Sequence, residues 1–463
     1  MNQTVPDEGP EPNGSTQERT LRRRLPAGVA DATLASLAAF GVGLVAVNVF
    51  DPAELGVYAV FFAAFMLGTM VAYQLVYVPA EVIAAALPVS KRLGVVRRSL
   101  ILGIAPSLVG TLAILLATVA TAGIATPELL TGLAVTAWLA TLVSPTQDHL
   151  RRLLHFRGWS WKAASVSAVQ LSAVIIAVIA MVRSDVPSAW IPFGALAMAN
   201  IASLSVALIL IGLQRAKSVG VPHLRFRDLA RPGRWLLLQA MLPMAAAFIA
   251  AWMITVLATP EDLGYADAAR IAAQPILVLG MGLSAVLSPR AMEAAIARQR
   301  LPADRTIGIH LTLVVVGGLA YLLLAGAPFV WNPMRVLVPT AYEISGLVAA
   351  TIGVNTVIAF LFVVTSELTA ARRERLLAVV SGLGGLAQIA ATGSAGAVGA
   401  FARPLGLGAS NAVRLGGYWY GRTQLYSDVA FGVSDEPGQD ANPGGIHSPE
   451  ISEGNGRSGN SGR

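Results

Sequence analysis

Three polar residues share one face of a long apolar segment and have the chemistry to hold an anion. Asp267, Arg270 and Gln274 stand at i, i+3 and i+7, which places them on one side of a helix. A charge at the bilayer centre costs roughly 2.5–3.5 kcal/mol even on the lenient insertion scale, so an arginine there is a functional candidate. We expect Arg270 to be a cationic point in a wet central cavity, with Asp267 holding its orientation. The alternative is a structural pair that snorkels to the outer interface.

A second polar face lies in the first half of the chain. Tyr73, Gln74, Tyr77 and Glu81 recur at helical spacing within another apolar segment. We expect Gln74 and Tyr77 to line the cavity, although aromatic residues near a helix end also form interface belts. Asp31, near the start of the first apolar segment, is a candidate proton or sodium site, although carboxylates at helix starts commonly interact with the helix dipole.

The chain contains no common motif for nucleotide, metal or nucleophilic chemistry. No G-x-x-x-x-G-K-[ST] sequence occurs, so the chain has no P-loop of its own. Cysteine is absent, which excludes disulfides and thiolate metal sites. The five histidines show no metal spacing, and we place His149 and His155 in a solvated loop beside Arg151 and Arg152. We therefore expect no enzyme, no cofactor and no metal.

The composition is that of a polytopic membrane protein. Charged residues make up 13% of the chain, against roughly 25% in a soluble domain. The mean hydropathy is +0.64. The formal net charge of +7 comes from cations in short loops between apolar runs, which indicates membrane topology and not nucleic-acid binding.

Apolar segments of membrane-spanning length recur along the chain. A membrane helix needs about 20 mostly apolar residues, and the last segment is the weakest because Arg403 and Arg414 interrupt it. We predict an all-α polytopic membrane protein of about 12 transmembrane helices. They cover residues 27–49, 55–83, 99–122, 128–146, 163–182, 190–213, 233–258, 263–289, 306–330, 341–365, 376–398 and 401–421.

The distribution of basic loops predicts the orientation. Every second loop is basic up to the tenth segment, which by the positive-inside rule places those loops and both termini in the cytoplasm. Residues 1–26 and 422–463 are poor in apolar residues and are predicted to be disordered tails. Residues 214–232 form a basic linker loop between an N-terminal half, 27–213, and a C-terminal half, 233–421.

A short repeat supports this division into halves. Pro52-Ala-Glu-Leu-Gly-Val-Tyr58 and Pro260-Glu-Asp-Leu-Gly-Tyr265 each place an acidic turn before an apolar run. We expect each run to be a single membrane-length helix. Two pseudo-symmetric six-helix halves around a central cavity are the architecture of a transporter.

The repeated segments resemble the multidrug/oligosaccharidyl-lipid/polysaccharide (MOP) exporter superfamily, specifically its polysaccharide-biosynthesis flippases. Residues 50–58 resemble the "l-g-p-e-e-f-G-l-Y" pattern that follows the first helix of that family. Residues 257–270 and Leu287-Ser-Pro-Arg290 resemble its eighth helix, with "a-a-R" and a terminal "l-x-P-r". By position, Arg270 matches a family arginine. The Asp-Arg pair of many members' seventh helix is replaced here by apolar residues 250–254, which leaves the drug-exporting branch open.

The resemblance implies a bacterial inner-membrane flippase for a polyprenyl-diphosphate-linked saccharide, working by alternating access. Its partners would be the lipid-linked saccharide, membrane lipids and other polysaccharide-assembly proteins, with no nucleic acid. An ion-coupled antiporter for drugs or small cations is the first alternative and would need an intramembrane carboxylate such as Asp31. A non-transporting scaffold of a polysaccharide-synthesis complex is the second.

Overall fold

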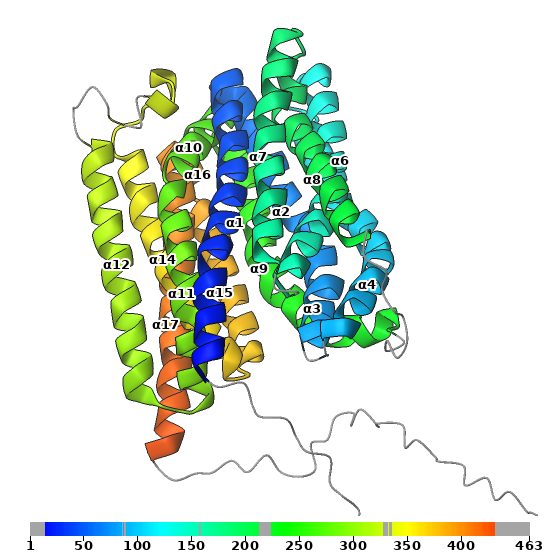
Figure 1. Ribbon diagram of the computed structural model, residues 1–463. Helices are drawn as coiled ribbons and strands as arrows, with labels where there is room; N and C mark the ends of the chain where they lie inside the picture. The colour runs from blue at the N-terminus through cyan, green and yellow to red at the C-terminus, as the bar shows by residue number, and fades with distance from the viewer. Residues whose placement is uncertain are drawn as a thin grey trace, which may run out of the picture.

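The described part of the chain is a bundle of long helices in two groups (Figure 1). The computed structural model describes residues 14–85, 87, 89–156, 159–212, 224–326, 332 and 336–430, and these contain no β-strand. The terminal face is here the end of the bundle at which α1 (Gly14–Val49) begins and α17 (Ala402–Ala430) ends, at the bottom of Figure 1. The opposite face is the end at which α2 (Pro52–Ala72) begins.

Each half contributes helices that run between the two faces. The N-terminal half contains α1, α2, the π-helical turn η1 (Tyr73–Tyr77), α3 (Val78–Ala85), α4 (Val89–Gly110), α5 (Leu112–Thr121), α6 (Pro127–Phe156), α7 (Ser160–Arg183), η2 (Ser188–Trp190) and α8 (Ile191–Gly212). The C-terminal half contains α9 (Phe226–Leu257), α10 (Pro260–Ala272), α11 (Gln274–Ile296), α12 (Arg300–Gly326), η3 (Thr340–Tyr342), α14 (Leu347–Ala370), α15 (Glu374–Thr392), α16 (Ala395–Val398), η4 (Gly399–Phe401) and α17.

The number of membrane spans agrees with the predicted fold class. Among the described residues, ten helical segments are long and apolar enough to cross a membrane, and the bent pair α10–α11 makes an eleventh. The last helix, α17, has the length at 29 residues, but three arginines lower its hydropathy. Two of these arginines pair with carboxylates of other helices inside the bundle, so α17 completes the C-terminal half as the twelfth helix.

The repeated acidic turns are helix caps. Asp51 accepts a hydrogen bond from the Glu54 backbone N–H at 2.8 Å, and Glu54 accepts one from the Asp51 backbone N–H at 3.4 Å. At the second copy, the Thr259 hydroxyl caps α10 by accepting from the Asp262 backbone N–H at 3.1 Å. The repeat therefore fixes where α2 and α10 begin.

The glycines of the repeat let the two halves touch at the opposite face. A Cβ atom on Gly56 would lie 1.9 Å from the Pro260 carbonyl oxygen, and one on Gly264 would lie 1.9 Å from that of Pro52. The two contacts are reciprocal, as expected of a pseudo-two-fold axis between α2 and α10. No residue with a Cβ fits at either position without moving a helix, so both glycines serve the interface between the halves.

The prediction of a single helix over 263–289 is wrong. The chain breaks at Ala273, and α10 and α11 meet at a bend of 42°. Pro275 has no N–H to continue the helical ladder. The Ala272 carbonyl instead accepts from the Tyr321 hydroxyl at 2.7 Å, and the Ala273 carbonyl accepts from Asn355 Nδ2 at 3.2 Å. Side chains of α12 and α14 therefore stabilise the break, as the rule for non-helical backbone in membranes requires.

Several helices extend further than the sequence predicts. The first helix starts at Gly14, α6 continues to Phe156, and α17 continues to Ala430, so parts of the two predicted tails and of one predicted loop are helical. Residues 226–232 of the predicted linker already belong to α9. The remainder of the tails and residues 213–223 of the linker lie outside the described residues.

Candidate functional site

A cavity of about 470 Å³ lies where η1 of the N-terminal half meets the C-terminal half. The lining residues of α14 run from Ile358 to Thr369, in the part of that helix nearer the terminal face. The cavity therefore occupies the half of the bundle nearer that face. Its polar lining consists of Gln74, Gln239, Thr365, Thr369, Ser381, Arg414 and Tyr418, and its apolar lining of Leu236, Ala240, Pro243, Met244, Ile358, Leu361 and Phe362.

Arg414 is the charged residue of this lining. Its Nε is buried without a hydrogen-bond partner, and no carboxylate of the described residues forms an ion pair with it. Gly384 of α15 leaves room for its stem, since a Cβ atom there would lie 3.2 Å from Arg414 Cγ. Near it, Ser381 and Tyr418 share a hydrogen bond of 3.0 Å between their hydroxyls. The sequence analysis noted Arg414 only as an interruption of the last segment.

The predicted pair of Asp267 and Arg270 is formed, and it has a third member. The Asp267 side chain is fully buried and accepts from Arg270 Nε at 2.7 Å and from Arg403 Nη1 at 2.7 Å. The Arg270 guanidinium lies 4.5 Å from the ring centroid of Phe62 on α2, in the other half. Two arginines on one carboxylate give the cluster a net charge of +1. It lies nearer the opposite face than Arg414 does.

The other predicted site residues fall in different places. Gln74 lines the cavity with Arg414, whereas Gln274 follows the break at Ala273, so helical spacing no longer places it on the face of Arg270. Tyr77 is fully buried and does not line the cavity. Its hydroxyl shares a 2.9 Å hydrogen bond with that of Thr146.

Tyr77 belongs to a buried network that contradicts the prediction of a solvated His149. The His149 side chain is fully buried and stacks on Tyr77, with ring centroids 4.3 Å apart. Its Nδ1 lies 2.9 Å from Glu81 Oε1 and its Nε2 lies 2.9 Å from Ser99 Oγ. A serine, a histidine and a carboxylate in this order resemble a nucleophilic relay. Because Ser99 is also fully buried, no substrate reaches it, and the network packs α3, α4 and α6 together.

Asp31 is also enclosed by partners. It accepts from Ser167 Oγ at 2.5 Å, from Arg151 Nη1 at 3.1 Å and lies 2.8 Å from His155 Nε2. Arg151 in turn holds Asp148 at 3.0 Å. Because α6 extends to Phe156, Arg151 and His155 are helical residues that face α1 and α7, which corrects their predicted place in a loop.

The C-terminal half has its own enclosed carboxylate. Glu367 on α14 is fully buried, lies 3.0 Å from Arg422 Nε and accepts from the Tyr426 hydroxyl at 2.7 Å. Arg422 also pairs with Asp304 of α12. Across the described residues, the four carboxylates Asp31, Glu81, Asp267 and Glu367 are thus buried against an arginine or a histidine, while the cavity is left with an unpaired cation.

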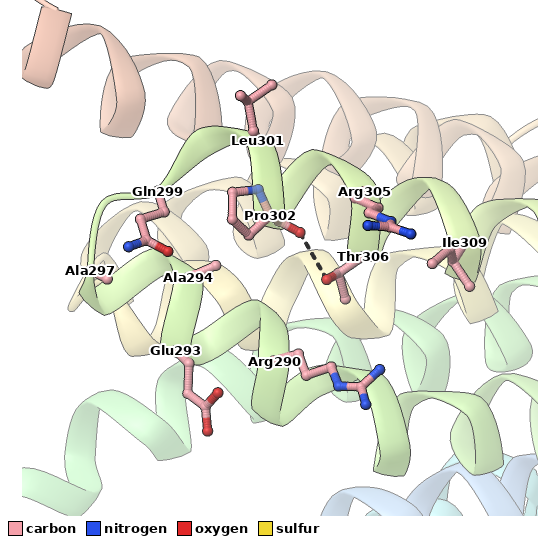
Figure 2. Close-up of a pocket in the computed structure, with 10 residues that line it drawn as sticks. All are labelled: Arg290, Glu293, Ala294, Ala297, Gln299, Leu301, Pro302, Arg305, Thr306 and Ile309. Carbon is pink, nitrogen blue, oxygen red and sulfur yellow. Dashed lines mark hydrogen bonds between the residues drawn. The ribbon is translucent and has the colours of Figure 1, made fainter.

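A second hollow of about 700 Å³ lies on the terminal face between α11 and α12 (Figure 2). Arg290 and Arg305 line it together with Glu293, and Figure 2 shows the two guanidinium groups on the same side of it. Its lining comes from α11, α12 and the turn between them. This hollow is therefore a feature of one half and not of the region between the halves.

The fold is that of known transporters. An inward-facing multidrug resistance MATE family transporter of the MOP superfamily matches with a TM-score of 0.70 and 14% identity, over 87% of this chain and 96% of that one. The MATE multidrug transporter DinF-BH, solved in complex with rhodamine 6G, matches with a TM-score of 0.64 and 12% identity, over 92% and 98%. An outward-facing MATE transporter matches with a TM-score of 0.55 and 14% identity, over 89% and 96%. No family model and no curated protein matches by sequence.

Proposed function

We infer that the protein is a transporter that works by alternating access, because the chain has the MOP-superfamily fold. The fold confirms, at the level of architecture, the resemblance seen in the sequence and the predicted twelve helices in two six-helix halves. The higher score for the inward-facing relative agrees with the reciprocal glycine contact that joins α2 and α10 at the opposite face. Both features describe a bundle closed at one face with its cavity nearer the other.

The cargo that we propose is an anionic amphiphile, of which a polyprenyl-diphosphate-linked saccharide is the class we favour. The observation that carries the choice of charge is the unpaired Arg414 in the cavity, in contrast to the four enclosed carboxylates. A cationic substrate would meet an uncompensated guanidinium there. The positive-inside pattern places the terminal face in the cytoplasm, so transport would run outward.

The membrane potential supplies a driving force for this direction. A diphosphate with about two negative charges that leaves an inside-negative cell gains roughly 4–5 kcal/mol per 100 mV. The chain therefore needs no P-loop of its own. Arg270, with a guanidinium only partly exposed beside Asp267 and Arg403, extends positive charge toward the opposite face along this route.

A second candidate is the antiport of drugs or small cations. The fold neighbours favour it, since two of those described above are multidrug transporters and one was solved with rhodamine 6G. Such a mechanism needs a carboxylate that gains and loses an ion, and Asp31 would have to leave Arg151 and His155 to do so. In this candidate Asp31→Asn abolishes transport, whereas in the proposed function it lowers the stability of the N-terminal half.

The decisive experiment is a mass-spectrometric inventory of polyprenyl-linked saccharides in cells that lack the protein, with leaflet accessibility scored. We expect one complete lipid-linked unit to accumulate on the cytoplasmic side and to clear when the wild-type chain is restored. Sensitivity to rhodamine 6G is measured in the same strains. An unchanged inventory together with new dye sensitivity would establish the antiporter instead.

A further inference from the structure

Arg414 is an unusual arginine for the middle of a membrane bundle. It follows the start of α17 by twelve residues, which is about 18 Å at a rise of 1.5 Å per residue, so it lies near half the thickness of the hydrocarbon. Arg403 and Arg422 on the same helix each hold a buried carboxylate. Arg414 has none among the described residues, and a charge kept there without a structural partner points to a ligand.

The surroundings of Arg414 define the kind of ligand. Gln74 and Gln239 add amide groups from two other elements, so donors converge on the cavity from both halves of the chain. A guanidinium with amide neighbours suits phosphate oxygens, which accept several hydrogen bonds at once. Met244, Leu361 and Phe362 line the remainder of the same cavity with apolar surface.

We propose that Arg414 is the residue that binds the phosphate or diphosphate group of an amphiphile while the cavity is accessible from the terminal face, with the first part of the hydrocarbon chain against the apolar lining. The inference deepens the proposed function and rests on it for the identity of the amphiphile. It assigns the primary phosphate contact to Arg414 in place of Arg270. Arg270 already gives two nitrogens to Asp267 and has its face over Phe62, so fewer of its donors are free.

The test is direct binding to the purified full chain in nanodiscs. The probe is geranylgeranyl diphosphate, with inorganic pyrophosphate and uncharged geranylgeraniol as separate arms. The variants are Arg414→Gln, Arg414→Lys and, as a matched loss of one exposed cation outside the cavity, Arg183→Gln in the last turn of α7. Size-exclusion profile and thermal midpoint without ligand show that each variant is folded.

We expect Arg414→Gln to bind geranylgeranyl diphosphate about tenfold more weakly or worse, because it loses a charge-assisted contact. Arg414→Lys should retain part of the affinity, and Arg183→Gln all of it. Pyrophosphate binding with the same dependence on Arg414 would identify a site for a free diphosphate, and its absence a site for a lipid. Unchanged affinity in folded Arg414→Gln, or equally tight binding of geranylgeraniol, overturns the inference.

The two proposals fail separately. If the inventory shows the accumulated lipid-linked unit but Arg414→Gln binds the probe normally, the transport proposal stands and the assignment of Arg414 is wrong. If binding depends on Arg414 but the inventory is unchanged, the phosphate site stands and the proposed cargo is wrong.

Discussion

Individual charges in this bundle fall into two kinds, those that hold the fold and those free to meet a ligand. The three arginines of α17 show both: Arg403 and Arg422 pair with buried carboxylates, and Arg414 lines the cavity. A buried carboxylate that loses its cation keeps its full desolvation cost, whereas an unpaired cation that is removed relieves one. Stability and ligand binding therefore separate residue by residue along one helix.

Arg422→Ala should destabilise the protein strongly, because it strands Glu367 inside the C-terminal half. Breaking a buried pair costs about 3–5 kcal/mol, and the Tyr426 hydroxyl that remains on Glu367 brings the expected loss to the lower end. The thermal midpoint in detergent measures this. Arg414→Ala, on the same helix, is the matched variant and should keep its midpoint. Equal losses in both variants would show that Arg414 also has a structural role.

The sequence identified part of this chemistry and missed the part that depends on tertiary contacts. Asp267 and Arg270 are three residues apart on one helix, so spacing alone predicts that they meet. Arg403 reaches the same carboxylate from another helix, and no local pattern contains that information. The signal that was available for Arg414 was the run of three arginines in an otherwise apolar last segment, which the hydropathy argument treated only as a weakness.

At the scale of elements, the break between α10 and α11 is the feature that apolar periodicity could not show. The apolar run continues through Ala273, and Pro275 alone does not reveal a break because prolines are common in membrane helices. The break is possible because Tyr321 and Asn355 occupy the freed carbonyls, and both come from helices about 50 to 80 residues later. The start of α10 was predictable because its cap is local.

Asn355→Leu should destabilise the C-terminal half by leaving the Ala273 carbonyl without a donor. The expected cost is about 1–2 kcal/mol, typical of interhelical hydrogen bonds in membranes. Asn411→Leu provides the matched control, since Asn411 Nδ2 donates at 3.4 Å to the Val354 carbonyl, which lies inside the continuous helix α14. A lower thermal midpoint for Asn355→Leu than for Asn411→Leu supports this account. The reverse order would show that the break does not rely on Asn355.

At the scale of the whole molecule, transport requires that α2 and α10 separate at the opposite face. The reciprocal contacts of Gly56 and Gly264 hold that face closed, and the space between the helices admits no Cβ atom. A methyl group added to Gly56 therefore disfavours the closed arrangement without touching the cavity. Overpacking costs roughly 1–3 kcal/mol, and each 1.4 kcal/mol shifts a two-state equilibrium about tenfold.

The absence of cysteine makes this shift measurable with one introduced thiol. Gln239→Cys places it in the cavity, where a membrane-impermeant maleimide applied from the side of the termini should label it. Adding Gly56→Ala should lower that rate about tenfold and raise labelling from the other side, because the population moves toward the state open at the opposite face. Gly41→Ala, on α1 with nothing within 4 Å of the added carbon, is the control. Unchanged labelling in the Gly56→Ala background would mean that the two halves do not exchange access through the α2–α10 contact.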